Sequence, residues 1–137
     1  MAMNNTYQKN RTWLIYANET ICDHIKAFQE IGKISWSTHV KMQIGDVVYV
    51  YVGPTQRRIM FRTVVAEKGV KQRVDKDYWK ENLDNKESYT LKLDATYQGS
   101  DELNEEQLCK HGFKGGRSLL TPNCNNVELL EYIQKWF

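Results

Sequence analysis

The sequence has few cysteines and prolines and no long hydrophobic run. Three of its 137 residues are cysteine and two are proline. An odd, widely spaced set of cysteines argues against a disulfide framework, so free thiols and a reducing compartment, the cytoplasm, are expected. No apolar stretch approaches the ~20 residues that a membrane-spanning helix needs. Residues 1–11 are polar and lack the apolar centre of a signal peptide, which predicts a disordered tail before one domain at 12–137.

Familiar catalytic motifs are also missing. The sequence contains no Gly-x-Ser-x-Gly, no Gly-x-x-x-x-Gly-Lys, no Gly-x-Gly-x-x-Gly and no His-Glu-x-x-His. Two Cys-x-His pairs, Cys22/His24 and Cys109/His111, would together supply four zinc ligands. Residues two apart on a helix, however, point about 200° away from each other, so neither pair chelates from a helical segment. We therefore predict no catalytic residues, no metal and no cofactor.

Charge is distributed unevenly along the chain, although the net charge is only +2. Residues 41–74 contain seven basic and two acidic side chains, and residues 75–107 contain ten acidic and four basic ones. A basic surface that faces an anionic ligand would produce this pattern. Solvated strand and helix faces that differ in charge would produce it equally well.

Hydrophobic periodicity predicts a mixed α+β domain. Strands are expected at 12–17, 47–52, 58–66 and 88–97, and helices at about 21–31, 102–110 and from Asn126 onward, with a short helix near Tyr78 and Trp79. The turn at Gly53-Pro54 joins two of these strands into a hairpin. Because strands and helices do not alternate regularly, the class is α+β, and a small curved sheet or barrel closes it naturally.

Two segments suggest a ligand. Trp36 is predicted to lie in a loop between two serines, where an indole can stack on a nucleobase. The alternative is a Trp folded inward to plug one end of a barrel. The glycine-rich segment 112–117 is predicted to expose backbone N–H groups beside Lys114 and Arg117, an arrangement that holds an anion unless it is a plain turn.

Several motifs together resemble the EVE-like domains of the PUA-like superfamily. They are Trp13–Asn18 (Trp-Leu-Ile-Tyr-Ala-Asn), Asp23, Ile34–Ser37, Gly45–Val52, Leu108–Gly115 and Leu129–Ile133. The resemblance covers nearly the whole chain from about residue 12. It implies a small curved β-barrel flanked by helices. It also implies nucleic-acid binding, since the related YTH and SRA-like domains accept a modified base in an aromatic pocket.

The resemblance further implies which residues form that pocket. Trp36-Ser37-Thr38 is similar to the Trp-small-Thr motif of YTH domains, so Trp36 would supply one wall and Ser37 a backbone or hydroxyl contact. Asn18 matches an Asn of the family that reads a base edge. Tyr16 and Ala17 would form the floor of the pocket, although the family more often has Pro or Cys at the position of Ala17. The other aromatic walls stay open among three candidates: Tyr51, Trp79 and Tyr89.

The predicted function is therefore a non-enzymatic nucleic-acid-binding domain that reads a modified or extruded base. Its phosphate contacts would come from basic residues: Arg57, Arg58, Lys114 and Arg117. Domains of this kind are often joined to nuclease or ATPase modules, so we expect any such effector to be a separate partner. Two alternatives are a small hydrolase of modified nucleosides, as the related ASCH domains suggest, with Lys41 or Lys114 as base or nucleophile, and a protein-interaction module.

Overall fold

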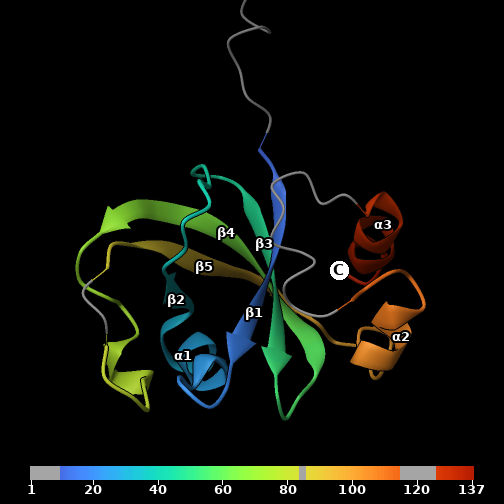
Figure 1. Ribbon diagram of the computed structural model, residues 1–137, viewed down its shortest axis with the longest axis horizontal. Helices are drawn as coiled ribbons and strands as arrows, with labels where there is room; N and C mark the ends of the chain where they lie inside the picture. Colours follow the sequence, from blue (N-terminus) through green and yellow to red (C-terminus); the bar gives the residue numbers. More distant parts are fainter. Residues whose placement is uncertain (1–9, 84–85, 115–125) are drawn as a thin grey trace, which may run out of the picture.

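The computed structural model describes residues 10–83, 86–114 and 126–137, and it contains one mixed five-stranded sheet (Figure 1). The strands are β1 (Thr12–Asn18), β2 (Lys33–Trp36), β3 (Val47–Gly53), β4 (Arg58–Val70) and β5 (Ser88–Thr96). The helices are α1 (His24–Ile31), the 3-10 helix η2 (Lys76–Tyr78), α2 (Glu105–Cys109) and α3 (Val127–Lys135). The predicted α+β class is confirmed.

The order of strands in the sheet is β1-β3-β4-β5-β2, with β1 parallel to β3 and the remaining neighbours antiparallel. The strands β1 and β2 are therefore the two edges of the sheet. The sheet curls into an open half-barrel, which brings both edges to the same side of the molecule with α1 beside them (Figure 1). This curl creates a seam between β1 and β2.

Alternation along the strands produces two separate cores, one on each face of the sheet. Every second residue of β3 from Val48 to Val52 packs with Phe28 and Phe61 in the core beside α1. The residues between them, Tyr49 and Tyr51, pack on the other face against α2 and α3. This two-sided burial explains why β3 is apolar on both faces, as expected of a central strand.

The predicted strands and the β3–β4 hairpin are confirmed, but several boundaries differ. Strand β4 continues to Val70 through its pairing with β5, in which Glu67 pairs with Thr90. The sequence pattern did not predict this extension, because residues 66–69 are exposed and carry no burial pattern. Helix α1 begins at His24 rather than at 21, because Asp23 caps it by accepting a hydrogen bond from the Lys26 N–H at 3.1 Å.

Two tryptophans lie in different settings from those predicted. Trp36 is not in a loop: it is the last residue of β2, a four-residue strand that pairs with β5. The helix setting of Trp136 predicts a place in the core, yet this residue is the C-cap of α3 and 37% exposed. Trp13 is buried as expected. The sequence did not predict strand β2, because its pairing partner β5 lies about fifty residues away and leaves no pattern in the local sequence.

The predicted tail and one part of the glycine-rich segment lie largely outside the described residues, at 1–9 and 115–125, and Arg117 lies there too. Arg11, at the end of the predicted tail, is held in place. Its N–H donates to Asp46 Oδ1 at 2.9 Å and its carbonyl accepts from the Val47 N–H. Among the described residues, no helix is long and apolar enough to cross a membrane.

Candidate functional site

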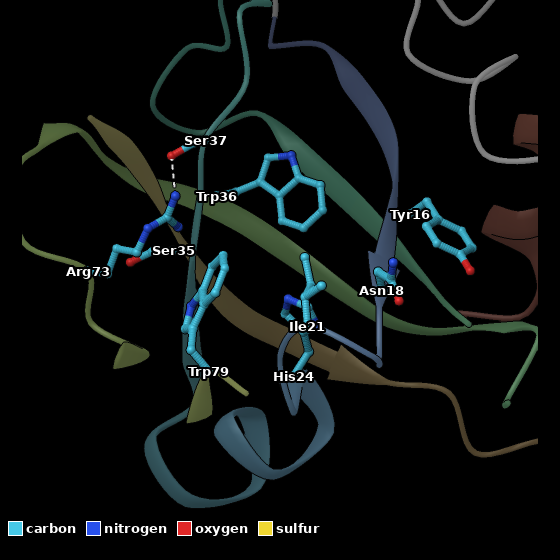
Figure 2. A pocket seen from close by; sticks show the side chains of 9 residues that line it. All are labelled: Tyr16, Asn18, Ile21, His24, Ser35, Trp36, Ser37, Arg73 and Trp79. Atoms are coloured by element: carbon cyan, nitrogen blue, oxygen red, sulfur yellow. Dashed lines mark hydrogen bonds between the residues drawn. The ribbon is translucent and has the colours of Figure 1, made fainter. Parts of the chain in front are cut away.

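A cavity of about 200 Å³ lies in the seam between the two edge strands. Its lining comes from β1, β2, the start of α1 and the segment before and after η2: Tyr16, Asn18, Ile21, His24, Ser35, Trp36, Ser37, Arg73 and Trp79 (Figure 2). In the view of Figure 2, Arg73 and Trp79 lie on one side and Asn18 and Tyr16 on the other. Residues far apart in the sequence therefore meet because the sheet curls.

Two indole rings form adjoining walls of the cavity. Trp36 is half-buried at the end of β2, and its ring centre lies 6.1 Å from that of His24. Trp79 is held by a hydrogen bond of 3.0 Å from its Nε1 to Asp75 Oδ1. Figure 2 shows the two indoles at an angle to each other. Both indoles line the same cavity.

The buried carboxylate of Asp75 fixes the segment that carries Trp79. Besides the indole, it accepts the Ser35 N–H at 3.1 Å, and the Val74 N–H in turn donates to Ser35 Oγ at 2.8 Å. Backbone pairing between Cys22 and Trp79 holds the same segment from the other side. Because β2 and the entrance to α1 both hold this segment, the wall that Trp79 forms is preorganised.

Arg73 places a positive charge at the cavity. Its guanidinium carbon lies 4.7 Å from the centre of the Trp79 ring, a cation–π arrangement. Its Nη2 donates to Ser37 Oγ at 2.7 Å, and the Ser37 hydroxyl donates to the Glu87 carbonyl at 3.0 Å. The Ser37 hydroxyl therefore orients Arg73, which is a different role from the direct ligand contact that the sequence predicted.

Asn18 and Tyr16 lie across the cavity from Arg73. The Asn18 carboxamide oxygen accepts hydrogen bonds from the backbone N–H and the hydroxyl of Thr20, at 2.9 and 2.6 Å. The Tyr16 ring stacks on Tyr51, with ring centres 5.5 Å apart. A Cβ atom at Gly53 would lie 2.9 Å from the Tyr16 hydroxyl, so the glycine leaves the space that this tyrosine occupies.

His24 is buried at the cavity, and burial lowers the pKa of its imidazole below the usual 6.5. The imidazole is therefore neutral at physiological pH. Its Nδ1 is shielded and has no hydrogen-bond partner among the described residues. A neutral imidazole carries one donor and one acceptor nitrogen, so His24 presents a polar but uncharged side chain beside the two indoles.

The structure brings together four of the six predicted pocket residues: Tyr16, Asn18, Trp36 and Ser37. The other two, Ala17 and Tyr51, do not line the cavity. Ala17 is fully buried in the core beside α1, because alternation along β1 turns it to the face opposite Tyr16. Tyr51 is buried between Tyr16 and Phe113 and donates to Glu105 at 2.7 Å. Burial raises the pKa of its hydroxyl.

The predicted phosphate-binding arginines do not line the cavity. Arg57 pairs with Glu105, and Arg58 donates to the Ser100 carbonyl at 2.8 Å and lies 3.7 Å from Asp101. Both therefore serve contacts between the β3–β4 hairpin and the segment around α2. Lys114 is exposed after α2, and Arg117 lies outside the described residues.

The two lysines considered for a hydrolase also lie away from the cavity. Lys41 is exposed in the connection between β2 and β3, and Lys114 follows α2. The described residues contain no group of three or more His, Cys, Asp or Glu side chains placed to hold a metal ion. The Cys22 thiol is buried, and burial, followed by the charge of Asp75, raises its pKa to about 12, which keeps it protonated.

The sequence analysis did not predict several residues that line the cavity. The missed lining residues are Ile21, His24, Ser35 and Arg73, and Trp79 was one of three candidates for a second aromatic wall. Tyr89, another of those candidates, instead receives a hydrogen bond from the Met42 N–H at 3.0 Å. The basic run that includes Arg73 was a usable signal, but it did not distinguish this arginine from its neighbours.

Comparison with protein-family models, with curated proteins and with solved structures finds no match for this chain.

Proposed function

We propose that this chain is a PUA-like domain that binds nucleic acid and holds one extruded or modified base against Trp36 and Trp79. The observation that carries the proposal is the cavity between the edge strands, which has two indole walls and polar side chains around them. Ligand sites in proteins commonly combine an apolar, aromatic lining with a few convergent polar groups. Stacking on aromatic side chains contributes roughly 1–3 kcal/mol per base.

The size of the cavity supports a single ring system. Its volume is about 200 Å³. An apolar cavity of about 150 Å³ holds benzene, whereas sites for drug-sized ligands span roughly 300–1,000 Å³. One heterocyclic base therefore fits inside, while the attached sugar and phosphates extend outside. A base inside a duplex would have to leave its stack to reach this position, as it does in base-flipping proteins.

Further depressions continue from the cavity and offer a path for the backbone of the strand. Ser37 lines both the cavity and a neighbouring depression that contains Thr38 and His39. Thr38 and Glu87 in turn lie in both this depression and a further one that contains Lys68. We place the flanking phosphates along this path, on the β2 side of the cavity, rather than at Arg57 and Arg58.

Binding without chemistry is the role we propose for this site. Besides Tyr16, the titratable side chains that line it are a neutral His24 and Arg73, whose guanidinium carries a positive charge. Base recognition needs stacking and one or two hydrogen bonds, which the indoles and Asn18 supply. A hydrolase would need a nucleophile or base at the ring, and neither Lys41 nor Lys114 lines the cavity.

Calorimetric titration with single-stranded DNA and RNA oligonucleotides, unmodified and modified, tests the proposal. Trp36→Ala and Trp79→Ala should each weaken binding by roughly 1–3 kcal/mol. Trp136→Ala is the matched control, since it removes an exposed indole on α3 and should leave the affinity unchanged. The proposal is wrong if all three variants bind like the unmodified protein, or if no oligonucleotide binds.

A further inference from the structure

The hydrogen-bond partners of Asn18 determine which end of its carboxamide a ligand meets. The oxygen is turned toward Thr20, where it accepts two hydrogen bonds at 2.9 and 2.6 Å. The amide nitrogen makes no hydrogen bond to the described residues, and Asn18 lines the cavity. This side chain therefore offers a ligand two N–H donors, because its acceptor is already used.

The opposite side of the cavity also presents donors. The Arg73 guanidinium carries a positive charge, and its Nη2 donates to Ser37 Oγ. The Ser35 oxygen accepts the Val74 N–H at 2.8 Å, so the proton of its hydroxyl is not used in that hydrogen bond. The proton of the Ser37 hydroxyl is already donated to the Glu87 carbonyl.

Carboxylates near the cavity are turned to groups of the protein itself. Asp75 accepts from the Ser35 N–H and the Trp79 indole, and Asp23 caps α1 through the Lys26 N–H. The Glu19 carboxylate accepts two backbone N–H groups of the β3–β4 turn. No Asp or Glu is among the described residues that line the cavity. His24, with one donor and one acceptor, favours neither kind of ligand edge.

From this distribution of donors, and resting on the proposed function, we infer that the cavity selects bases whose exposed edge carries carbonyl oxygens. Uracil and hypoxanthine have such an edge. Cytosine and adenine have an amino group in place of one carbonyl, and that group would face the Asn18 N–H groups or the Arg73 guanidinium. Two donors that face each other at the cavity both lose hydrogen bonds to water without gaining a partner, which penalises the amino bases.

Matched nucleoside pairs test this inference without any contribution from phosphate. Uridine is compared with cytidine, and inosine with adenosine, by calorimetric titration. We expect the carbonyl member of each pair to bind about tenfold more tightly, the effect of roughly one hydrogen bond. Asn18→Asp retains an oxygen for Thr20 and replaces the amide donors by an acceptor, so it should reverse the preference within each pair. Asn104→Asp is the matched control, because it makes the same change at the cap of α2.

The outcomes separate the inference from the proposed function. If nucleosides of a pair bind equally, or the amino member binds more tightly, the inference is wrong while the base-binding function stands. If neither member of either pair binds, the inference is wrong, and if the oligonucleotides do not bind either, the proposed function is wrong as well. If Asn18→Asp does not fold, as judged by its melting curve, the ratio measured within each pair for the unmodified protein decides the inference by itself.

Discussion

The indole N–H of Trp13 donates a hydrogen bond of 2.8 Å to Oδ2 of Asp46, and both side chains are buried. The same carboxylate accepts the backbone N–H groups of Arg11 and Gln43, each at 2.9 Å. Asp46 therefore ties the start of β1 to the turn that leads into β3. Two parts of the motif that resembles EVE-like domains, the first Trp and the Gly45-Asp46 pair, thus act in the framework of the fold and do not line the cavity.

Removing this carboxylate should destabilise the fold without altering the cavity. Asp46→Ala leaves three N–H donors without their acceptor, among them the buried indole of Trp13, so we expect a loss of about 3 kcal/mol in the free energy of unfolding. Urea denaturation followed by circular dichroism measures the change. Asp94→Ala, which breaks the more exposed Arg62–Asp94 pair, is the control and should cost less than about 1 kcal/mol. Equal losses for the two variants would contradict the role given to Asp46.

The buried His24 should make stability depend on pH. Its pKa is lowered in the folded state relative to 6.5, so the unfolded chain binds more protons below that pH. The stabilisation is fully present above pH 6.5 and is lost as the pH falls toward the lower folded-state pKa. Melting temperatures between pH 7.5 and 5 should fall more steeply for the unmodified protein than for His24→Gln. His39→Gln removes an exposed histidine and should keep the original pH dependence of the melting temperature. If this variant loses that dependence, His24 is not its source.

Salt dependence should distinguish the two surfaces considered for phosphate binding. If flanking phosphates lie beside Lys68, the logarithm of the affinity for a single strand falls with the logarithm of the salt concentration. Lys68→Ala should then reduce this slope by about 0.7, the value for one phosphate contact. Arg57→Ala should leave the slope unchanged, because Arg57 pairs with Glu105 at the hairpin. The reverse result would return the phosphates to the hairpin arginines that the sequence suggested.

Local patterns were sufficient to predict much of the fold. The apolar run of β3, the alternation in β5, the turn at Gly53-Pro54 and the cap at Asn126 are properties of neighbouring residues, and the structure contains them all. Strand β2 depends instead on pairing with a distant partner, so its four residues looked like a loop. Local propensity predicts an element well only where the element stabilises itself or repeats a clear pattern.

The site was predicted only in part for a related reason. Tyr16, Asn18 and Trp36 belong to motifs near the start of the chain, whereas Arg73 and Trp79 come from a polar segment without hydrophobic periodicity. What places that segment at the cavity is the buried Asp75, through its hydrogen bonds to Ser35 and Trp79. The contact between Asp75 and Ser35 links positions 40 residues apart and leaves no trace in local spacing.

The placement of the four tryptophans gives the protein its own optical reporter. Trp36 and Trp79 line the cavity, while Trp13 is buried beside Asp46 and Trp136 lies on α3. A base that stacks on the first two indoles would quench their fluorescence, and the other two would continue to emit as a constant background. Replacement of Trp136 by phenylalanine would lower that background at an exposed position. Occupancy of the seam between the edge strands would then be visible in the unlabelled protein.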